Sequence, residues 1–221
     1  MGHFFNRAAT AITLFIFFVL FFLYLPPIFT ALMLTAVLLT ILFSEWPRLM
    51  DPKKLPFWLI TPFYPVLPFV LMIYMSYFSD YRQVLFYMMI IAFSQDTGGY
   101  LVGKAIGKHK LASYISPKKT WEGFWGGIAF TLLITYLIIS NRNPAISFSV
   151  IFMISLSSSI LSTLGDLSES WLKRKAGVKD SGTLLPGHGG FMDRFDSFLL
   201  IIFVFFIFRD YFLKIFNIKP L

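Results

Sequence analysis

The chain has 221 residues, of which 57% are hydrophobic and only 14% are charged. Soluble domains carry about 25% charged residues, so this composition excludes an ordinary soluble protein and indicates an integral membrane protein. The absence of cysteine excludes a disulfide scaffold, a thiolate metal site and a cysteine nucleophile. A net charge of +8 is explained by basic loops that face anionic lipid, so no nucleic-acid partner is expected.

Apolar stretches long enough to cross a bilayer as helices, about 20 residues each, recur along the chain. They predict an all-α, polytopic transmembrane helix bundle that forms one integral membrane domain over residues 1–221. About seven spans are expected, at residues 8–25, 28–44, 57–79, 83–103, 121–140, 146–172 and 192–214.

Two of these expected spans have special features. The first is interpreted as a retained span, because it lacks a small-x-small cleavage site and Pro26-Pro27 lead into the next apolar run. The third contains Pro62, Pro65 and Pro68, which predict a kink or a partly re-entrant segment.

The basic residues predict an orientation in the membrane. With seven spans, fourteen of the 19 Lys and Arg residues lie on the side that holds residues 104–120 and 173–191. The positive-inside rule therefore predicts that the N-terminus and these two motif-bearing loops are cytoplasmic, in a bacterial-type plasma membrane, and that the C-terminus is outside. Residues 1–90 are interpreted as scaffold spans, and residues 91–221 hold nearly every unusual polar group.

The sixth expected span carries a polar stripe. Its polar residues recur at steps of three or four, which puts them on one helical face; they are Ser155, Ser159, Ser162, Asp166, Ser170 and Lys173. Helix–helix contacts through hydroxyls would explain the serines. They do not explain Asp166 and Glu169, because two carboxylates one turn apart repel each other unless a cation neutralises them.

A second carboxylate pair, Asp193 and Asp196, begins the seventh expected span. Asp166 from one helix and Asp193 from the next could close an all-oxygen site, which suits Mg²⁺. A preference for helix N-termini would explain one of the pair, but not two acids with Arg194 between them. The excess of carboxylates over His and Cys argues against zinc.

Between the two pairs lies a glycine-rich turn, Leu185–Gly190, whose backbone N–H groups are suited to an anion. His188 within it is more typical of a structural hydrogen-bonder than of a catalyst. Lys173, Arg174 and Lys179 precede it and are candidates for phosphate binding, although ordinary positive-inside residues are an open alternative. For Lys175 that alternative is preferred.

A second motif-bearing loop repeats this logic. Asp96 with two glycines ends the fourth expected span, and Lys118 and Lys119 stand just before the fifth, where Thr120 is a plausible N-cap and Glu122 follows. Carboxylates that hold divalent cations, beside cations that bind phosphate, are typical of phosphoryl or nucleotidyl transfer. No Walker loop and no G-x-S-x-G nucleophile elbow is present.

The residues from Ser170 to Asp196 read S-W-L-K-R-K-A-G-V-K-D-S-G-T-L-L-P-G-H-G-G-F-M-D-R-F-D. This stretch resembles the defining motif of the phosphatidate cytidylyltransferases, also called CDP-diacylglycerol synthases. The segments S-P-K-K-T-W-E-G at 116–123, D-T-G-G-Y at 96–100 and G-D-L-S-E-S at 165–170 resemble other blocks of that family. The resemblance covers about residues 90–200.

The resemblance implies a Mg-dependent nucleotidyltransferase of phospholipid biosynthesis, which transfers CMP from CTP to phosphatidate to give CDP-diacylglycerol and pyrophosphate. It implies that Asp166 and Asp193 hold Mg²⁺, with room for a second cation such as K⁺, and that Asp196 and Glu169 support them. Lys118, Lys119, Lys173 and Arg174 would bind the leaving pyrophosphate. The other substrate-binding residues that it implies are Asp96, Glu122, Ser170, Lys179, Asp180, His188, Gly189, Gly190 and Arg194.

The same resemblance implies contact with membrane lipids and a homodimer. Three alternatives stay open from the sequence. A CTP-dependent lipid or polyprenol kinase would transfer the γ-phosphoryl group, but the His-Gly-Gly-x-x-Asp-Arg-x-Asp block favours the cytidylyltransferase. A CDP-alcohol phosphotransferase would have a D-G-x-x-A-R opening, which is absent. An ion-coupled transporter would place its charges near the midplane and show repeated halves.

Overall fold

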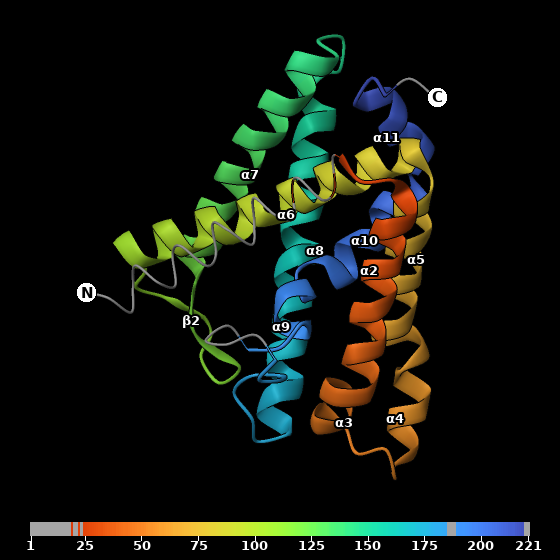
Figure 1. Ribbon diagram of the computed structural model, residues 1–221. Helices are drawn as coiled ribbons and strands as arrows, with labels where there is room; N and C mark the ends of the chain where they lie inside the picture. The colour runs from red at the N-terminus through yellow and green to blue at the C-terminus, as the bar shows by residue number, and fades with distance from the viewer. Residues whose placement is uncertain (1–18, 20–21, 23, 185–188, 219–221) are drawn as a thin grey trace, which may run out of the picture.

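The computed structural model describes residues 19, 22, 24–184 and 189–218, and it confirms an all-α bundle with one small hairpin (Figure 1). In chain order the elements are α2 (Pro27–Thr40), the π-helical turn η1 (Ile41–Glu45), α3 (Trp46–Leu49), α4 (Leu55–Ile60), η2 (Pro62–Val66), α5 (Leu67–Tyr77), α6 (Ser79–Ile106), β1 (Lys110–Ala112), β2 (Ser116–Thr120), α7 (Trp121–Arg142), α8 (Phe148–Lys175), α9 (Met192–Phe195), α10 (Phe198–Ile207) and α11 (Arg209–Ile215).

The expected count of seven spans is not confirmed. In the described part of the chain, four helical segments are long and apolar enough to cross a membrane: Pro27–Leu49, Leu55–Tyr77, Trp121–Arg142 and Phe148–Lys175. They correspond to the second, third, fifth and sixth expected spans. The first, at 8–25, lies almost wholly outside the described residues.

The fourth and seventh expected spans differ from their predictions for physical reasons. The segment 83–103 is helical, but it belongs to α6, whose polar residues keep it out of the set of candidate spans. In Figure 1, α6 runs obliquely across the bundle while α7 and α8 stand steeply against it. The segment 192–214 is broken into α9, α10 and α11, of which α10 is a short apolar helix of 10 residues.

The kink predicted in the third span is confirmed. Tyr64 has φ −153° and ψ 109°, which are not helical angles, and it lies inside η2 between Pro62 and Pro65. Prolines lack the N–H that would continue the helical ladder, so the chain changes direction here before α5 resumes. The change brings the ring of Tyr64 against the fully buried Trp46, with ring centroids 5.9 Å apart.

Residues 104–120, expected only as a loop, contain an antiparallel hairpin. Strands β1 and β2 pair with Lys110 opposite Thr120 and Ala112 opposite Ser116. Thr120 then caps α7 as predicted, because its hydroxyl oxygen accepts a hydrogen bond from the Gly123 N–H at 3.1 Å. The cap fixes where the strand ends and the helix begins, and so fixes the place of Lys119.

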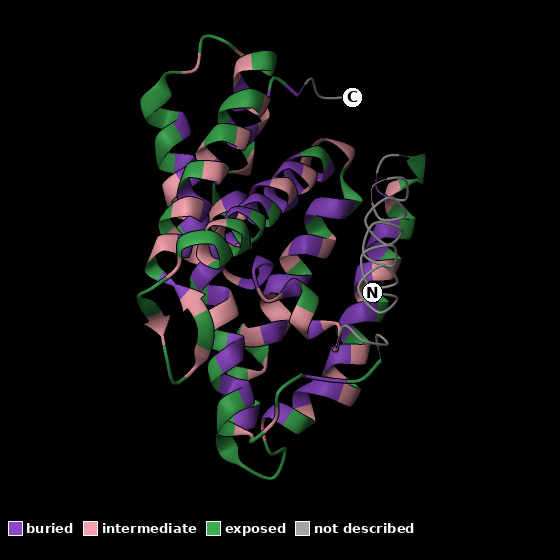
Figure 2. Ribbon diagram, turned by 90° about the vertical axis from the view of Figure 1, so that its left-hand side faces the viewer, coloured by how far each residue is buried: buried purple, intermediate pink, exposed green. Residues whose placement is uncertain are grey.

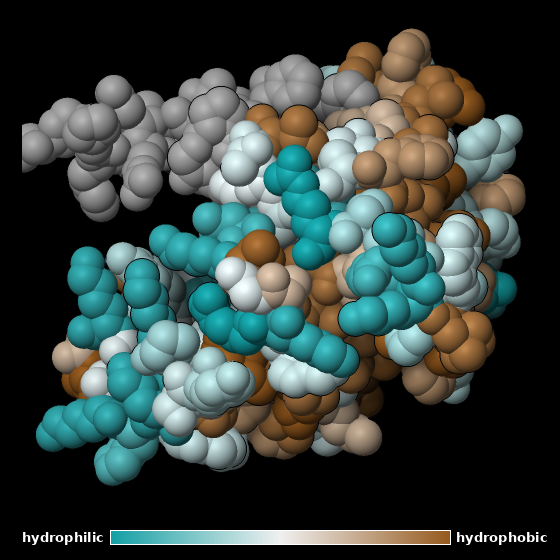
Figure 3. All heavy atoms as spheres, turned by 90° about the horizontal axis from the view of Figure 1, so that it is seen from below, coloured by the Kyte–Doolittle hydropathy of each residue, from teal (hydrophilic) through white to brown (hydrophobic). Residues whose placement is uncertain are grey.

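Buried residues gather on the inward faces of the helices, and the outward faces stay exposed (Figure 2). The core is built of large apolar side chains from α2, α5, α6 and α10, such as Leu34, Phe69, Met88 and Phe205. Apolar outward faces are what a lipid environment requires, since lipid offers no hydrogen bonds to polar groups. Seen from below, hydrophilic side chains gather over the end of the bundle that carries the hairpin and the loop after α8 (Figure 3).

That gathering agrees with the predicted sorting of basic residues to one side. The turn between α3 and α4, the hairpin and the α8–α9 loop all lie in the lower half of Figure 1, whereas the α7–α8 turn and α11 lie at the upper end. Which end faces the cytoplasm stays a prediction.

Helices α6 and α7 approach each other through glycines. A Cβ added at Gly98 would lie 2.5 Å from the Cβ of Phe130, and one added at Gly126 would lie 2.4 Å from the side chain of Val102. Real Cβ atoms do not approach so closely, so both positions depend on the missing side chain. Small residues allow membrane helices to pack at backbone distance, and here they hold the two helices that frame one of the pockets described below.

We expect Gly126→Ala to destabilise the protein by about 1–3 kcal/mol, because the added methyl group overpacks against Val102. The matched control is Gly99→Ala, whose Cβ would make only an ordinary contact of 3.5 Å with the Gly123 carbonyl oxygen. Helix propensity favours alanine over glycine by about 1 kcal/mol, so the control should be neutral or stabilising. Thermal unfolding in detergent measures both, and equal shifts would contradict the close packing at Gly126.

Candidate active site

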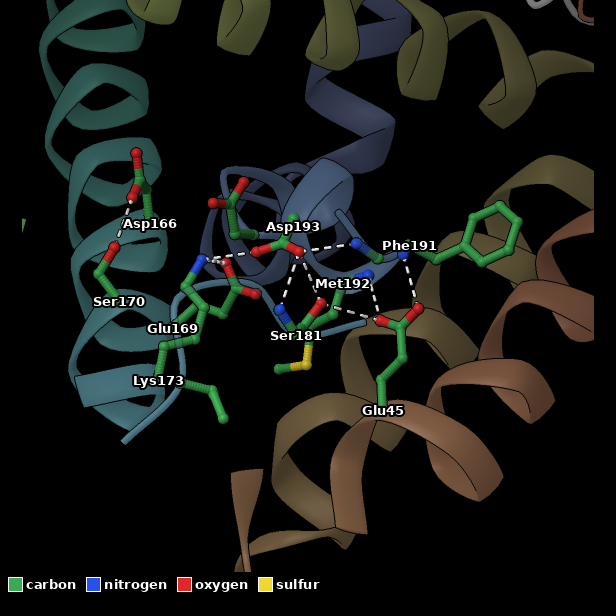
Figure 4. Close-up of polar contacts among 12 residues, drawn as sticks. Glu45, Asp166, Glu169, Ser170, Lys173, Ser181, Phe191, Met192 and Asp193 are labelled. Atoms are coloured by element: carbon green, nitrogen blue, oxygen red, sulfur yellow. Dashed lines mark hydrogen bonds and ion pairs between the residues drawn. The ribbon is translucent and has the colours of Figure 1, made fainter. Parts of the chain in front are cut away.

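The site is organised around the ammonium group of Lys173, which bridges two acids from different segments. Its Nζ donates to Glu169 Oε2 at 3.0 Å, one turn earlier on α8, and to Asp193 Oδ1 at 2.7 Å, on α9. Figure 4 shows Lys173 pointing between these two carboxylates. The Glu169 side chain is fully buried and that of Lys173 is only 11% exposed, so this ion pair ties the polar stripe of α8 to Asp193. The described residues before Asp193, 181–184 and 189–192, are called the signature loop here.

Asp193 is held by the loop that precedes it as well as by Lys173. Its Oδ2 accepts hydrogen bonds from the Ser181 N–H at 2.9 Å, the Ser181 hydroxyl at 2.9 Å and the Gly190 N–H at 2.8 Å. Burial alone would raise the pKa of Asp193, but Lys173 and these donors outweigh it and place the pKa below its usual range. Asp193 is therefore a carboxylate in the described geometry. Gly189, with φ +78°, makes room for it, since a Cβ there would lie 2.5 Å from Asp193 Oδ2.

One turn before Ser170 on α8, Asp166 forms a second ion pair. Its Oδ2 lies 2.5 Å from the Nζ of Lys119 at the end of β2, and its Oδ1 accepts from the Ser170 hydroxyl at 3.2 Å. This pairing could not be predicted from the sequence. The structure brings Lys119, of the segment 116–123, to Asp166, of the segment 165–170.

A pocket of about 320 Å³, called pocket 1 here, opens beside this ion pair. Its walls come from α6, the hairpin, the start of α7 and α8, and they are lined by Gln95, Asp96, Gly99, Tyr100, Leu111, Ser116, Lys118, Lys119, Thr120, Gly123, Phe124, Thr163 and Asp166. The pocket thus combines two lysines and two acids with aromatic side chains, which is a lining suited to an anionic ligand that carries a ring.

Two further acids complete a cluster around Asp166. The hydroxyl of Ser197 donates to Asp96 Oδ2 at 2.7 Å, and the Ser197 N–H donates to Asp196 Oδ1 at 2.7 Å. Burial, together with the negative charges of Asp166 and Asp96, raises the pKa of Asp196 to about 7. Ser197 thereby links α6 to the turn between α9 and α10.

The carboxylate oxygens of this cluster are the type of ligand that a hard cation prefers. Five carboxyl groups (Asp96, Asp166, Glu169, Asp193 and Asp196) face two ammonium groups, those of Lys119 and Lys173. One carboxylate oxygen, Glu169 Oε1, is buried and has no hydrogen-bond partner in the described part of the chain. An all-oxygen, electron-rich set is what Mg²⁺ prefers. Within the described ranges, no three His, Asp or Glu side chains converge closely enough to hold a metal ion, and the lysines stand against Asp166 and Asp193 instead.

An apolar pocket of about 430 Å³, called pocket 2, lies against another face of α8. It is lined by Ile60, Tyr64, Ile115, Leu164, Leu167, Ser168, Trp171, Leu172 and Leu200. The hydroxyl of Tyr64 is buried there without a hydrogen-bond partner among the described residues. A pocket of this composition is suited to hydrocarbon.

Other expected site residues lie apart from the cluster. Glu122 accepts hydrogen bonds from the backbone N–H groups of Lys108 and His109 and contacts the His109 ring at 2.6 Å, so it fastens the start of the hairpin. Arg174 reaches the Ile115 carbonyl oxygen at 3.2 Å. Lys179, Asp180 and Arg194 are exposed. His188 lies outside the described residues, whereas Gly190 lies beside Asp193.

Sequence reasoning missed Glu45, which is fully buried at the end of η1 and contacts the signature loop. The only local signal was a single carboxylate at the end of an apolar run, directly before Trp46-Pro47. Such a residue reads as the start of a loop, and its partners are 136 to 147 positions away along the chain.

Comparison with known proteins shows the family to which the chain belongs. Residues 53–212 match the Cytidylyltransferase family, which is well over half of the chain. The chain belongs to this family. It is 47% identical over 133 residues to the phosphatidate cytidylyltransferase of Bacillus subtilis (strain 168). The match covers 57% of this chain and 49% of that protein.

Two other relatives carry the same name. The protein of Staphylococcus haemolyticus (strain JCSC1435) is 42% identical over 124 residues, and that of Staphylococcus aureus (strain COL) is 46% identical over 128 residues. In both cases the match covers 56% of this chain and 48% of the relative. The chain thus spans about half the length of the relatives that it matches, and the family resemblance found in the sequence motifs is confirmed.

We expect Lys173→Met to destabilise the fold by about 3–5 kcal/mol, because it leaves the buried Glu169 and Asp193 without their shared counter-charge. The matched control is Lys175→Met two positions later, where the lysine is exposed and its Nζ lies 5.0 Å from the centroid of the Trp171 ring. The control should cost less than about 1 kcal/mol. Thermal unfolding in detergent compares the two, and similar small losses would show that the Lys173 bridge does not hold the cluster together.

Proposed function

We propose that this protein is a phosphatidate cytidylyltransferase, which transfers CMP from CTP to phosphatidate and gives CDP-diacylglycerol and pyrophosphate. The observation that supports it best is a carboxylate–lysine cluster in the wall of pocket 1, with the apolar pocket 2 on another face of the same helix, in a chain of the Cytidylyltransferase family. Pocket 1 has cationic and aromatic walls that suit a nucleoside triphosphate, and pocket 2 has apolar walls that suit acyl chains.

In the proposed reaction, an oxygen of the phosphatidate phosphate attacks the α-phosphorus of CTP. The bond between that phosphorus and the oxygen that bridges to the β-phosphate breaks, and pyrophosphate leaves with the bonding electrons. A phosphate monoester is already an adequate nucleophile, so no strong general base is needed. Positioning and charge neutralisation are then the main work of the protein.

The residues of pocket 1 would bind the triphosphate. Lys119 has its ammonium group against Asp166, and Lys118 stands beside it on β2, so both can turn to phosphate oxygens. Lys173 contacts Asp193, and Arg174 follows it on α8 and reaches the Ile115 carbonyl oxygen. We propose that these two side chains neutralise the leaving pyrophosphate. Tyr100 and Phe124 offer aromatic surface to the base.

Asp166 and Asp193 would hold Mg²⁺, with Glu169 and Asp196 behind them and room for a second cation such as K⁺. When bound, the divalent cation supplies neutralisation of phosphate charge. The two acids are held by Lys119 and Lys173 in the described geometry, so the lysines would be free to bind phosphate once the cation takes their place. The homodimer implied by the resemblance stays a prediction.

Product analysis of the purified protein with phosphatidate, Mg²⁺ and CTP labelled in its cytidine tests the function. We expect labelled CDP-diacylglycerol and pyrophosphate, and we expect Asp193→Asn to abolish turnover while the protein stays folded. CDP and an unlabelled phosphorylated lipid would instead indicate a CTP-dependent kinase. No turnover of CTP with any lipid acceptor would reject both enzyme functions and favour the ion-coupled transporter.

We expect Lys119→Ala to raise the KM for CTP by about tenfold, because it removes a charge-assisted contact to phosphate. The matched control is Lys110→Ala, which removes an exposed lysine of the same hairpin that does not line pocket 1. Steady-state kinetics at saturating phosphatidate measures both variants. An unchanged KM for CTP in Lys119→Ala would count against pocket 1 as the triphosphate site.

A further inference from the structure

Glu45 reaches from the N-terminal helices to the backbone of the signature loop. Its Oε1 accepts a hydrogen bond from the Phe191 N–H at 2.7 Å, and its Oε2 accepts from the Met192 N–H at 2.8 Å and from the Ser181 hydroxyl at 3.1 Å. The residue is 0% exposed. In Figure 4, Glu45 approaches the loop from the side opposite Lys173.

The groups that compensate the buried Glu45 carboxylate are hydrogen-bond donors of the signature loop. Across the described residues, Glu45 forms no ion pair with a lysine, arginine or histidine. A buried charge is tolerated only where hydrogen bonds replace the lost water. The two backbone N–H groups and the hydroxyl therefore have to keep their positions for Glu45 to remain buried. Equally, the buried Glu45 carboxylate restrains the positions of these three donors.

Ser181 connects Glu45 to the proposed metal ligand. Its hydroxyl lies 3.1 Å from Glu45 Oε2 and 2.9 Å from Asp193 Oδ2. Since a hydroxyl has a single proton, the two carboxylates compete for one donor. The Ser181 N–H donates to the same Asp193 oxygen at 2.9 Å. Glu45 and Asp193 thus hold one short segment between them, Glu45 from the scaffold side and Asp193 from the cluster side.

Two glycines of the signature motif are explained by Glu45. A Cβ at Gly190 would lie 2.6 Å from the Glu45 carboxyl group and 2.4 Å from the Ser181 hydroxyl oxygen. A Cβ at Gly182 would lie 3.0 Å from Glu45 Oε1. The absence of side chains at these positions leaves the space that the buried carboxylate occupies.

We propose that Glu45 is a positioning residue: it holds Ser181, Phe191 and Met192 in place so that Asp193 faces Lys173 and the carboxylate cluster. Glu45 lies outside residues 53–212, the part that matches the family, and nothing in the signature motif itself points to it. Its consequence for catalysis rests on the proposed function, but its effect on the loop does not. The N-terminal helices then act on the reaction through one carboxylate.

The test compares Glu45→Gln with Asp210→Asn in the full-length protein purified in detergent. A glutamine keeps the shape but turns an NH₂ group toward a backbone N–H, so one of the two loop contacts is lost. Asp210→Asn is the acid-to-amide control: within the described part of the chain, the Asp210 carboxylate accepts from the Tyr81 hydroxyl at 2.6 Å, and α11, which carries Asp210, lies at the opposite end of the bundle from the hairpin. Amide hydrogen exchange of the peptide that covers residues 189–196 is the primary measurement, with kcat and KM as the second.

We expect Glu45→Gln to speed exchange at Phe191 and Met192 on the order of tenfold, with exchange elsewhere unchanged. We expect kcat to fall by about 10²-fold with little change in the KM for CTP, since the loss is one of position. Asp210→Asn should change neither. Unchanged exchange at 189–196 in Glu45→Gln would overturn the proposal, and so would an equal rise over the whole chain.

If Glu45→Gln does not yield folded protein, Glu45→Asp decides the matter, because it keeps the carboxylate but shortens the side chain by one methylene and so weakens its bonds to the Phe191 and Met192 N–H groups. Faster exchange at 189–196 supports the proposal, and unchanged exchange there rejects it. If the wild-type protein shows no CTP turnover but its Glu45 variants still lose protection of the loop amides, the proposed function is rejected. Glu45 then remains the positioning residue of the loop.

Discussion

The ion pair of Lys173 with Glu169 and Asp193 is the interaction on which the rest of the site depends. It lies at the point where an apolar helix meets a polar loop, and it is buried on both sides. Without it, α8 would carry an uncompensated acid inside the bundle, at a cost of several kcal/mol. With it, the ammonium group of Lys173 compensates both acids inside the bundle. The cluster is therefore a structural element that joins α8 to α9, and the proposed binding site is built on it.

The bundle places this cluster by contacts that are individually simple. Glycines let α6 and α7 approach at backbone distance, Thr120 fixes the change from strand to helix, and Ser197 joins Asp96 to Asp196. None of these residues would bind substrate through a charge. Each sets the relative position of segments that bear charges, and a reaction governed by positioning depends on such residues as much as on the charged ones.

Local patterns in the sequence correctly predicted features that arise within a single helix or at its ends. The steps of three and four in α8 correctly placed its serines and acids on one buried face, and the prolines of residues 57–79 correctly predicted a kink. The cap at Thr120 was also read from its position before an apolar helix. These features depend on neighbours within about one helical turn, which is why residue spacing reveals them.

Features that depend on distant partners could not be predicted in this way. The oblique course of α6 follows from what it packs against, and the ion pair of Lys119 with Asp166 joins residues from separate motifs. Glu45 is the clearest case, since an acid at the end of an apolar run has no local signal for a partner 146 positions away. The division of the chain into scaffold and catalytic halves was likewise read from local composition, which gives no sign of a contact between the halves such as that of Glu45 with Phe191 and Met192.

The two pockets have a consequence for the order of events. Pocket 1 includes Thr163 and Asp166 of α8, whereas pocket 2 includes Leu164, Ser168 and Trp171 on a different face of the same helix. Under the proposed function, a nucleotide in pocket 1 and a lipid in pocket 2 would lie on different faces of α8 and would share no lining residue. Neither substrate would then have to bind before the other.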